Sequence, residues 1–131
     1  NAHAILSDTN IKDAVEYMLS DGVIGLPVID TQEHVVGYVS EQDCIKAMLS
    51  SSYHSGESSK NVADVMKTDV LTKKPYESIL ELADEMSGTK PKTYPVVDDD
   101  NRLIGCINRT NVLKALDMHL HSIYEQGTRV V

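Results

Sequence analysis

Two stretches, Leu26-Pro27-Val28-Ile29-Asp30 and Tyr94-Pro95-Val96-Val97-Asp98, share one pattern and stand 68 positions apart. The same spacing places Gly37 on Gly105 without a gap. The chain therefore contains an internal repeat. Because two units of this length are too few for an open solenoid, we expect the two copies to pack face to face and to cover each other's apolar surface.

The composition suits a single globular body with a substantial core. The chain has 131 residues, is 41% hydrophobic and contains no Trp or Phe, so the core must consist of aliphatic side chains with help from six Tyr. The formal net charge is −8 and the isoelectric point is about 4.9. Because this charge repels a phosphate backbone, we expect no nucleic-acid partner.

The cysteines and the apolar runs indicate a cytoplasmic protein. Cys44 and Cys106 do not correspond under the repeat, which favours buried thiols in a reducing compartment over a disulfide. No apolar run approaches the roughly 20 residues that span a bilayer, so we expect no membrane insertion. No signal peptide is visible. The chain opens directly into a strand-like Ala4-Ile5-Leu6, which suggests a piece of a longer protein.

Each copy predicts the same order of elements. Apolar residues at positions 11, 14, 15, 18 and 19 have the spacing of an amphipathic helix, capped by Asn10 with Asp13 three residues on; Ser78 and Glu81 repeat this cap. Short β-branched runs on either side of positions 30–34 and 98–101 predict hairpins, and a second helix follows each hairpin. The prediction is an α/β (α+β) fold with the order strand, helix, strand, strand, helix, twice. In it, helices cover one face of each small three-stranded sheet and the sister repeat covers the other.

The pattern divides the chain into four parts. The first repeat covers residues 4–49 and the second covers 62–120, beginning with a short helical turn and a strand near Val70 and Leu71. Residues 50–61 between them are rich in Ser, which predicts a flexible linker that tolerates shortening. Residues 121–131 form a tail that either prolongs the last helix or frays.

The combined motifs resemble a pair of CBS domains, the Bateman module. The resemblance rests on Leu26-Pro27-Val28-Ile29-Asp30, on the turn from Gly37 to Asp43 that runs into a helix, on Asp64-Val65-Met66, and on the tandem copy. It covers residues 4–120. It implies two repeats packed sheet to sheet with pseudo-twofold symmetry, and a cleft between them. Such modules bind AMP, ADP, ATP or S-adenosylmethionine as a regulatory ligand and control an attached or partner effector.

The segment Ser40-Glu41-Gln42-Asp43 has two interpretations. It is a capping box, in which Ser40 and Asp43 satisfy N–H groups at a helix start. The same helix start offers free N–H groups and a positive dipole end to a phosphate. The resemblance implies that Asp43 binds both ribose hydroxyls, that Ser40 and Gln42 lie near the phosphate or ribose, and that Tyr38 lines the cleft.

The second copy departs from this pattern. It carries Asn108, Arg109, Thr110 and Asn111 at the matching positions, so the carboxylate is replaced by an amide. An uncharged amide holds a diol less well, by about 1–2 kcal/mol, and we expect a weaker second cleft. Arg109 either meets a phosphate or is solvated.

The resemblance also implies the remaining walls of the Asp43 cleft. They come from the strand that enters the second repeat and from the residues before each Pro-Val pair. Lys92 is the single cation among them and either contacts a phosphate or is a solvated loop residue. The predicted wall residues are Gly25, Leu26, Thr68, Val70, Leu71, Lys92, Thr93 and Tyr94.

Other chemistries lack their motifs. The five His have no metal-ligand spacing, and we find no Walker loop, dinucleotide fingerprint or nucleophile elbow. The run Asp98-Asp99-Asp100-Asn101 occupies a predicted hairpin tip, where solvated residues are expected rather than a calcium site. We therefore predict a ligand-sensing module rather than an enzyme, with no cofactor or metal, and a homodimer that pairs helix faces. The alternative is a dimerisation module with vestigial clefts.

Overall fold

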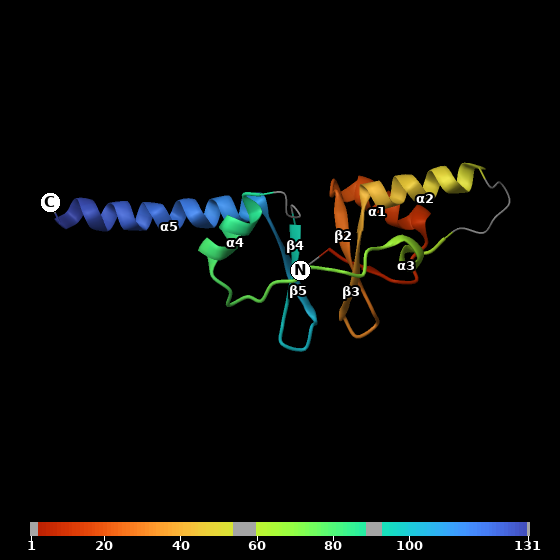
Figure 1. Ribbon diagram of the computed structural model, residues 1–131, viewed down its shortest axis with the longest axis horizontal. Helices are drawn as coiled ribbons and strands as arrows, with labels where there is room; N and C mark the ends of the chain where they lie inside the picture. The colour runs from red at the N-terminus through yellow and green to blue at the C-terminus, as the bar shows by residue number, and fades with distance from the viewer. Residues whose placement is uncertain (1–2, 54–59, 89–92, 131) are drawn as a thin grey trace.

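The computed structural model describes residues 3–53, 60–88 and 93–130. Two halves lie side by side, with the strands of both toward the middle and the helices toward the outside and along one edge (Figure 1). The last helix extends away from the body, and its end is the far end of the molecule (Figure 1). This arrangement is the doubled α+β fold that the repeat predicts.

The first half contains a three-stranded sheet and three helices. The sheet has the order β1-β2-β3, with β1 parallel to β2 and β2 antiparallel to β3. The elements are β1 (Ile5–Leu6), α1 (Ile11–Asp21), β2 (Gly25–Ile29), β3 (Val35–Ser40), α2 (Glu41–Tyr53) and α3 (Val62–Val65).

Helix α1 forms where the spacing predicts it. The Asn10 side chain accepts a hydrogen bond from the Asp13 N–H at 2.8 Å, which confirms the predicted cap. The helix ends at Gly22, whose φ of 66° lies in the left-handed region that favours glycine. Ile11, Ala14 and Met18 are buried on the inward face and form much of the first core.

The second half repeats the plan with a smaller sheet. Its elements are α4 (Ile79–Met86), β4 (Thr93–Val97), β5 (Leu103–Asn108) and α5 (Arg109–Val130). The Ser78 hydroxyl accepts from the Glu81 N–H at 3.5 Å, in the predicted place. Leu82, Met86, Tyr94 and Val112 form its core.

The strand predicted near Val70 and Leu71 is absent, and this part of the prediction was wrong. Among the described residues, the second sheet has two strands, and only Lys73 meets β4, through a bridge with Val96. The Lys73 N–H donates to the Pro95 carbonyl at 2.9 Å, and the Lys73 carbonyl accepts from Val97 at 2.8 Å. The pairing stops there because Pro75 has no N–H and the Lys74 N–H donates to Glu77 Oε2 at 2.5 Å.

Helix α3 packs against the first half, although the sequence pattern assigns it to the second repeat. Val62 is fully buried in the first core. Its N–H donates to the Thr9 carbonyl at 2.8 Å, and the Ala63 N–H donates to Ser7 at 3.1 Å. The first core is thus completed by chain that follows the predicted linker.

Helix α2 runs further than predicted, and α5 takes one of the two courses that the sequence left open. α2 continues to Tyr53, past the predicted repeat end at Leu49, and α5 continues to Val130, so the described part of the tail prolongs that helix. Residues 54–59 of the predicted linker lie outside the described residues.

The two hairpin tips are built alike and contact each other. Asp30 Oδ1 accepts from the N–H groups of Gln32 and His34, each at 2.9 Å, and Asp98 repeats this turn. Backbone bonds then join the tips, from Val35 N–H to the Asn101 carbonyl at 3.1 Å and from Leu103 N–H to the Glu33 carbonyl at 2.9 Å. The aspartates of the acidic run serve as turn residues, as expected.

Across the described ranges, every helix is too short or too polar to traverse a bilayer.

Candidate functional site

Asp43 stands in the first turn of α2 and forms a capping box with Ser40. Its Oδ2 accepts from the Ser40 N–H at 2.9 Å, and the Ser40 hydroxyl accepts from the Asp43 N–H at 3.2 Å. These bonds satisfy N–H groups that a helix start leaves unpaired. Within the described part of the chain, the second carboxylate oxygen, Oδ1, makes no hydrogen bond and remains an acceptor.

The second repeat builds the same box from amides. The Asn108 N–H donates to Asn111 Oδ1 at 3.0 Å, and the Asn111 N–H donates to Asn108 Oδ1 at 2.8 Å. The two helix starts therefore share their geometry and differ in charge. This is the asymmetry that the sequence predicts between the two motifs.

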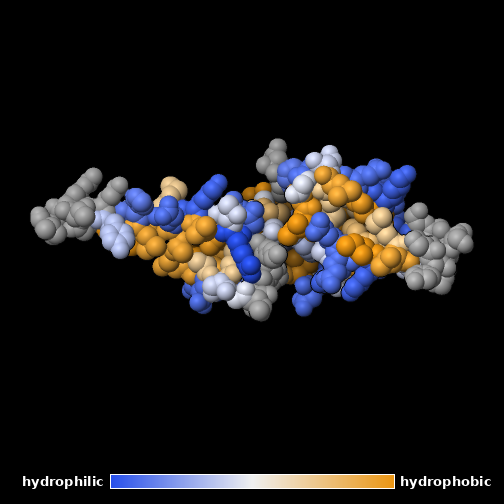
Figure 2. Space-filling model, turned by 90° about the horizontal axis from the view of Figure 1, so that it is seen from above, coloured by the Kyte–Doolittle hydropathy of each residue, from blue (hydrophilic) through white to orange (hydrophobic). Residues whose placement is uncertain are grey.

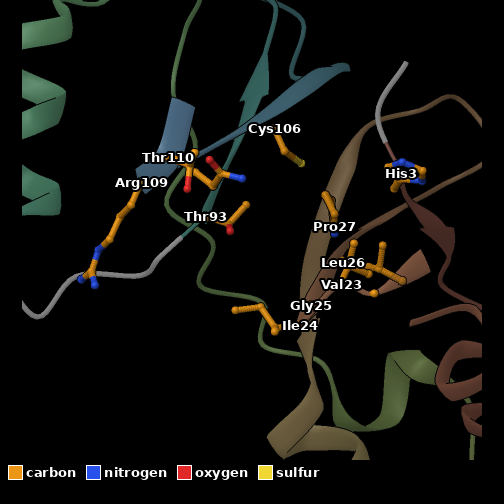
Figure 3. A pocket seen from close by; sticks show the side chains of 12 residues that line it. His3, Val23, Ile24, Gly25, Leu26, Pro27, Thr93, Cys106, Arg109 and Thr110 are labelled. Atoms are coloured by element: carbon orange, nitrogen blue, oxygen red, sulfur yellow. The ribbon is translucent and has the colours of Figure 1, made fainter. Parts of the chain in front are cut away.

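An open cleft of about 490 Å³ lies between the two repeats. One wall comes from the loop after α1 and from β2, and the other from β4, β5 and the first turn of α5 (Figure 3). The lining residues are His3, Gly22, Val23, Ile24, Gly25, Leu26, Pro27, Thr93, Cys106, Asn108, Arg109 and Thr110.

This cleft combines residues that the sequence assigns to two different sites. Gly25, Leu26 and Thr93 were predicted beside Asp43, yet they lie opposite the second repeat's motif at 108–110. The Leu26 side chain is 1% exposed and belongs to the first core, as expected for its direction. The Leu26 side chain is therefore not available to the cleft.

The other predicted residues do not line this cleft. Asp43 lies at a separate recess of about 200 Å³, beside Lys46 and Lys60. Tyr94 is fully buried in the second core, and Leu71 is 45% exposed. Lys92 lies outside the described residues. The described residues from the predicted site that are outside the cleft lining are Tyr38, Ser40, Gln42, Asp43, Thr68, Val70, Leu71, Tyr94 and Asn111.

The repeat relates this cleft to a second position that contains the Asp43 motif. A shift of 68 maps Asn108–Thr110 onto Ser40–Gln42, and maps residues 22–27 onto 90–95. Of that second wall, residues 89–92 lie outside the described residues. The Asp43 position consequently stays a prediction.

Tyr38 lies against Gly25 and reaches the second repeat, although it does not line the cleft. A Cβ placed on Gly25 would lie 2.7 Å from both Cε1 and the hydroxyl oxygen of Tyr38, so only glycine admits the ring there. The Tyr38 hydroxyl also shares a hydrogen bond with Thr93 of the second repeat. Burial, followed by the neighbouring Cys106, raises the pKa of Tyr38, which keeps the phenol neutral at physiological pH.

Sequence reasoning missed six cleft residues, which are His3, Gly22, Val23, Ile24, Pro27 and Cys106. Cys106 corresponds to Tyr38 under the repeat, so the shift alone would have found it. Both cysteines are free thiols, but Cys106 is exposed, which corrects the expectation that both are buried. His3 lies 2.9 Å from Asp21 and 3.1 Å from the Tyr17 hydroxyl, contacts that no local pattern signals.

Arg109 does not extend into the cleft. Its guanidinium donates to the Gly88 carbonyl at 3.0 Å, and its side chain runs away from Leu26 and Pro27 (Figure 3). Arg109 is exposed to solvent, which agrees with one of the two roles that the sequence left open.

Comparison with known proteins gives consistent matches. A family model described as the CBS domain matches residues 1–50 and 62–118. The chain is 32% identical to inosine-5'-monophosphate dehydrogenase of Nitrosopumilus maritimus over 131 residues, which is the whole chain and 26% of that protein. It is 28% identical over 139 residues to CBSX2, a chloroplastic CBS domain-containing protein of Arabidopsis thaliana, covering 88% of the chain and 58% of that relative.

Solved structures agree with these sequence matches. A crystal structure of CBSX2 in complex with AMP has a TM-score of 0.77 at 31% identity, covering 90% of this chain and 89% of that one. The CBS domain pair of MJ0100, crystallised with 5'-methylthioadenosine and S-adenosylmethionine, has the same fold, with a TM-score of 0.74 at 22% identity. Together with the family match over both repeats, they show that the chain belongs to the CBS domain family and carries a tandem CBS pair.

Proposed function

We propose that this CBS pair is a regulatory module that binds an adenosine-containing ligand between its repeats. The observation that carries the proposal is the open cleft of about 490 Å³, which places the Gly25–Leu26 backbone opposite the first turn of α5. Backbone N–H and C=O groups can form hydrogen bonds with the edge of an adenine base. The N–H groups of a helix start suit a phosphate or a ribose oxygen. The similar CBSX2 pair with bound AMP supports this ligand class.

Asp43 is proposed as the ribose ligand of the repeat-related position. Its free Oδ1 is charged, and hydrogen bonds to a carboxylate are stronger than those to an amide. The Asn108–Asn111 motif offers the same geometry without the charge. We therefore propose that the Asp43 position binds more tightly than the described cleft.

The module acts on an effector by changing the relative position of its repeats. The hairpin tips and Tyr38 connect the two sheets, so a ligand between the sheets contacts both halves. The free energy by which the ligand shifts the equilibrium between two arrangements of the repeats cannot exceed the difference in its binding free energy to them. No catalytic step is assigned to the module.

A thermal-shift screen with AMP, ADP, ATP and S-adenosylmethionine tests the proposal. A ligand at a hundred times its Kd stabilises the folded state by about 2.7 kcal/mol, which a melting curve resolves. Inosine and guanosine monophosphates serve as base controls. If no adenosine compound raises the melting temperature, the sensing role is rejected.

A dimerisation module is the second candidate, and the helix surfaces favour it. Apolar side chains are exposed along α2 and α5, where Leu49 is 57% and Leu113 is 67% exposed. The view from above shows apolar surface over both halves (Figure 2). Sedimentation at micromolar concentration tests this candidate, since a single species of 14.4 kDa contradicts a homodimer.

A further inference from the structure

The two hairpin tips hold the only non-glycine residues with positive φ in the described part of the chain. They are Glu33, at 70°, and Asn101, at 65°. They stand 68 positions apart, so both copies of the repeat adopt the left-handed conformation at the same place. Asparagine adopts this conformation more readily than glutamate does. A residue such as Glu33 stays in it only where the surrounding structure requires that backbone geometry.

Both residues use this geometry to reach the other repeat. The Glu33 carbonyl accepts from the Leu103 N–H at 2.9 Å, and the Asn101 carbonyl accepts from the Val35 N–H at 3.1 Å. Val35 and Leu103 also stand 68 positions apart, so the exchange is symmetric. The Asn101 side chain adds a third bond, from Nδ2 to the Val35 carbonyl at 3.1 Å. The tips thus fix the two sheets to each other at this end.

The second tip is also fixed within its own repeat. Lys74 Nζ donates to the Asp98 carbonyl at 2.9 Å, and the Tyr76 hydroxyl donates to Asp99 Oδ1 at 3.1 Å. These bonds join the tip to the segment before α4, and the turn around Asp98 holds its backbone. The tip therefore moves together with the rest of its repeat.

The ligand cleft lies at the opposite end of the strands. β2 begins there with Gly25, and β5 ends there with Asn108. These strands have five and six residues, so at about 3.3 Å per residue the cleft lies roughly 17–20 Å from the tips. Among the described residues, no backbone hydrogen bond joins the two sheets at the cleft end. The side chains of Tyr38 and Thr93 meet there instead.

Helix α5 begins in a wall of this cleft. It runs from Arg109 to Val130, away from the body and across the direction of the strands (Figure 1). Its 22 residues span about 33 Å. The far end of α5 is therefore more distant from the tips than the cleft walls are, and a rotation about the tips moves that end further.

We propose that the paired hairpin tips are the pivot about which the two repeats turn when a ligand occupies the cleft, and that α5 carries this movement outward. Hinge motions are absorbed by a few loop residues while the packed bodies stay rigid. The ligand then changes the width of the cleft and the direction of α5, and the bonds at the tips stay formed. The driving ligand is the one of the proposed function, whereas the pivot itself exists without it.

Distances between pairs of spin labels, measured by pulsed electron paramagnetic resonance, test the pivot. Unnatural amino acids carry the labels, so both native cysteines stay in place. A tip pair joins Gln32 to Asp100, a lever pair joins Lys12 to Ser122, and a control pair within the second repeat joins Glu81 to Ser122. All five side chains are exposed.

Without ligand, we expect narrow distance distributions for the tip and control pairs and a broader one for the lever pair. A tip distribution as broad as that of the lever pair overturns the pivot. A control distribution as broad as that of the lever pair also overturns it, because α5 would then bend by itself.

With saturating AMP, the mean distance of the lever pair should change by about 2 Å or more, while those of the tip and control pairs stay within about 1 Å. Melting of the same labelled proteins shows whether AMP has bound. Bound AMP with an unchanged lever pair, or with a changed tip pair, overturns the proposal. If AMP does not bind, the proposed function fails, and the distributions without ligand alone decide whether the tips are a pivot.

Two variants of Asn101 test the bonds at the tips. Asn101→Ala removes the side-chain bond to Val35 and disfavours the left-handed conformation, so the distribution of the tip pair should broaden. Asn101→Gly also lacks this bond but adopts the conformation freely, so its tip pair should stay closer to that of the parent. Melting shows that both variants are folded. A tip pair as narrow in Asn101→Ala as in the parent means that the tips do not hold the sheets together, and this result overturns the proposal.

Discussion

The Tyr38 ring lies against Gly25 so closely that a Cβ on Gly25 would be 2.7 Å from the Tyr38 hydroxyl oxygen. The hydroxyl continues across to Thr93, so one side chain of the first repeat reaches the second. Under the repeat, Thr93 stands where Gly25 stands and Cys106 stands where Tyr38 stands. The first repeat thus pairs the large Tyr38 with a glycine, and the second repeat pairs the small Cys106 with Thr93.

Gly25→Ala is expected to displace Tyr38 and to destabilise the protein by about 1–3 kcal/mol, the usual cost of overpacking. Urea unfolding measures the change. The double variant Gly25→Ala with Tyr38→Ala should recover part of this cost, because the clash is gone. Additive losses in the double variant would show that the two side chains do not meet.

Gly37→Ala and Gly105→Ala should have opposite consequences. The new Cβ at residue 37 meets Met66 and the Lys67 backbone, so we expect a loss of about 1–3 kcal/mol in unfolding free energy. At residue 105 the space is open, and the smaller entropy of the unfolded chain should leave stability unchanged or raise it by up to about 1 kcal/mol. Equal effects at both positions would contradict the packing difference between the repeats.

Lys73→Ile should be tolerated, although Lys73 is 8% exposed and forms an ion pair of 2.6 Å with Glu85. The first repeat has the buried Ile5 at this position, and the Glu85 side chain that loses its partner is 38% exposed, so water can solvate its carboxylate. Glu85→Ala removes the partner instead and should cost about 1–3 kcal/mol. Thermal unfolding of the two variants provides the comparison; a more damaging Lys73→Ile would refute this reasoning.

Acid should weaken the hairpin tips. Bonds from the His34 and Arg102 N–H groups lower the pKa of Asp30 and of Asp98, respectively, below the ordinary 3.8. A lowered folded-state pKa contributes stability above the unfolded value, and this is lost as pH falls through the folded value. The urea concentration at the unfolding midpoint should therefore decrease when the pH is lowered below about 4. The double variant Asp30→Asn with Asp98→Asn should lose less stability at acid pH than the parent. If the two proteins lose the same stability, other carboxylates cause the effect.

The repeat predicted the helices and hairpins because apolar spacing and turn residues are local signals. The caps at Asn10 and Ser78 were found for the same reason. The sequence pattern did not show that Val62 completes the core of the first repeat, since this depends on chain returning across the linker. The strand predicted near Val70 and Leu71 failed for a similar reason. Pairing with β4 ends at Lys74 and Pro75, and the residue types at 70 and 71 do not show whether a neighbouring strand is available to pair with them.

The sequence alone indicates the two helix-start motifs but not which strand residues lie opposite each of them. Asn108–Thr110 and Gly25 are all cleft residues, yet spacing along the chain does not tell which wall faces which helix start. The 68-residue shift from Tyr38 gives the position of Cys106, whereas no sequence pattern places His3 in the cleft.

Calorimetric titration of AMP into the parent, Asp43→Asn and Asn111→Ala tests the central claim most directly, with the apo melting temperature of each variant as the control for helix capping. The account predicts that the parent binds and that Asp43→Asn weakens binding by about 1–2 kcal/mol, the difference expected between a carboxylate and an amide, while Asn111→Ala has a smaller effect. Parent-like binding by Asp43→Asn, together with loss of binding in Asn111→Ala, would contradict the assignment and move the site to the second repeat's motif.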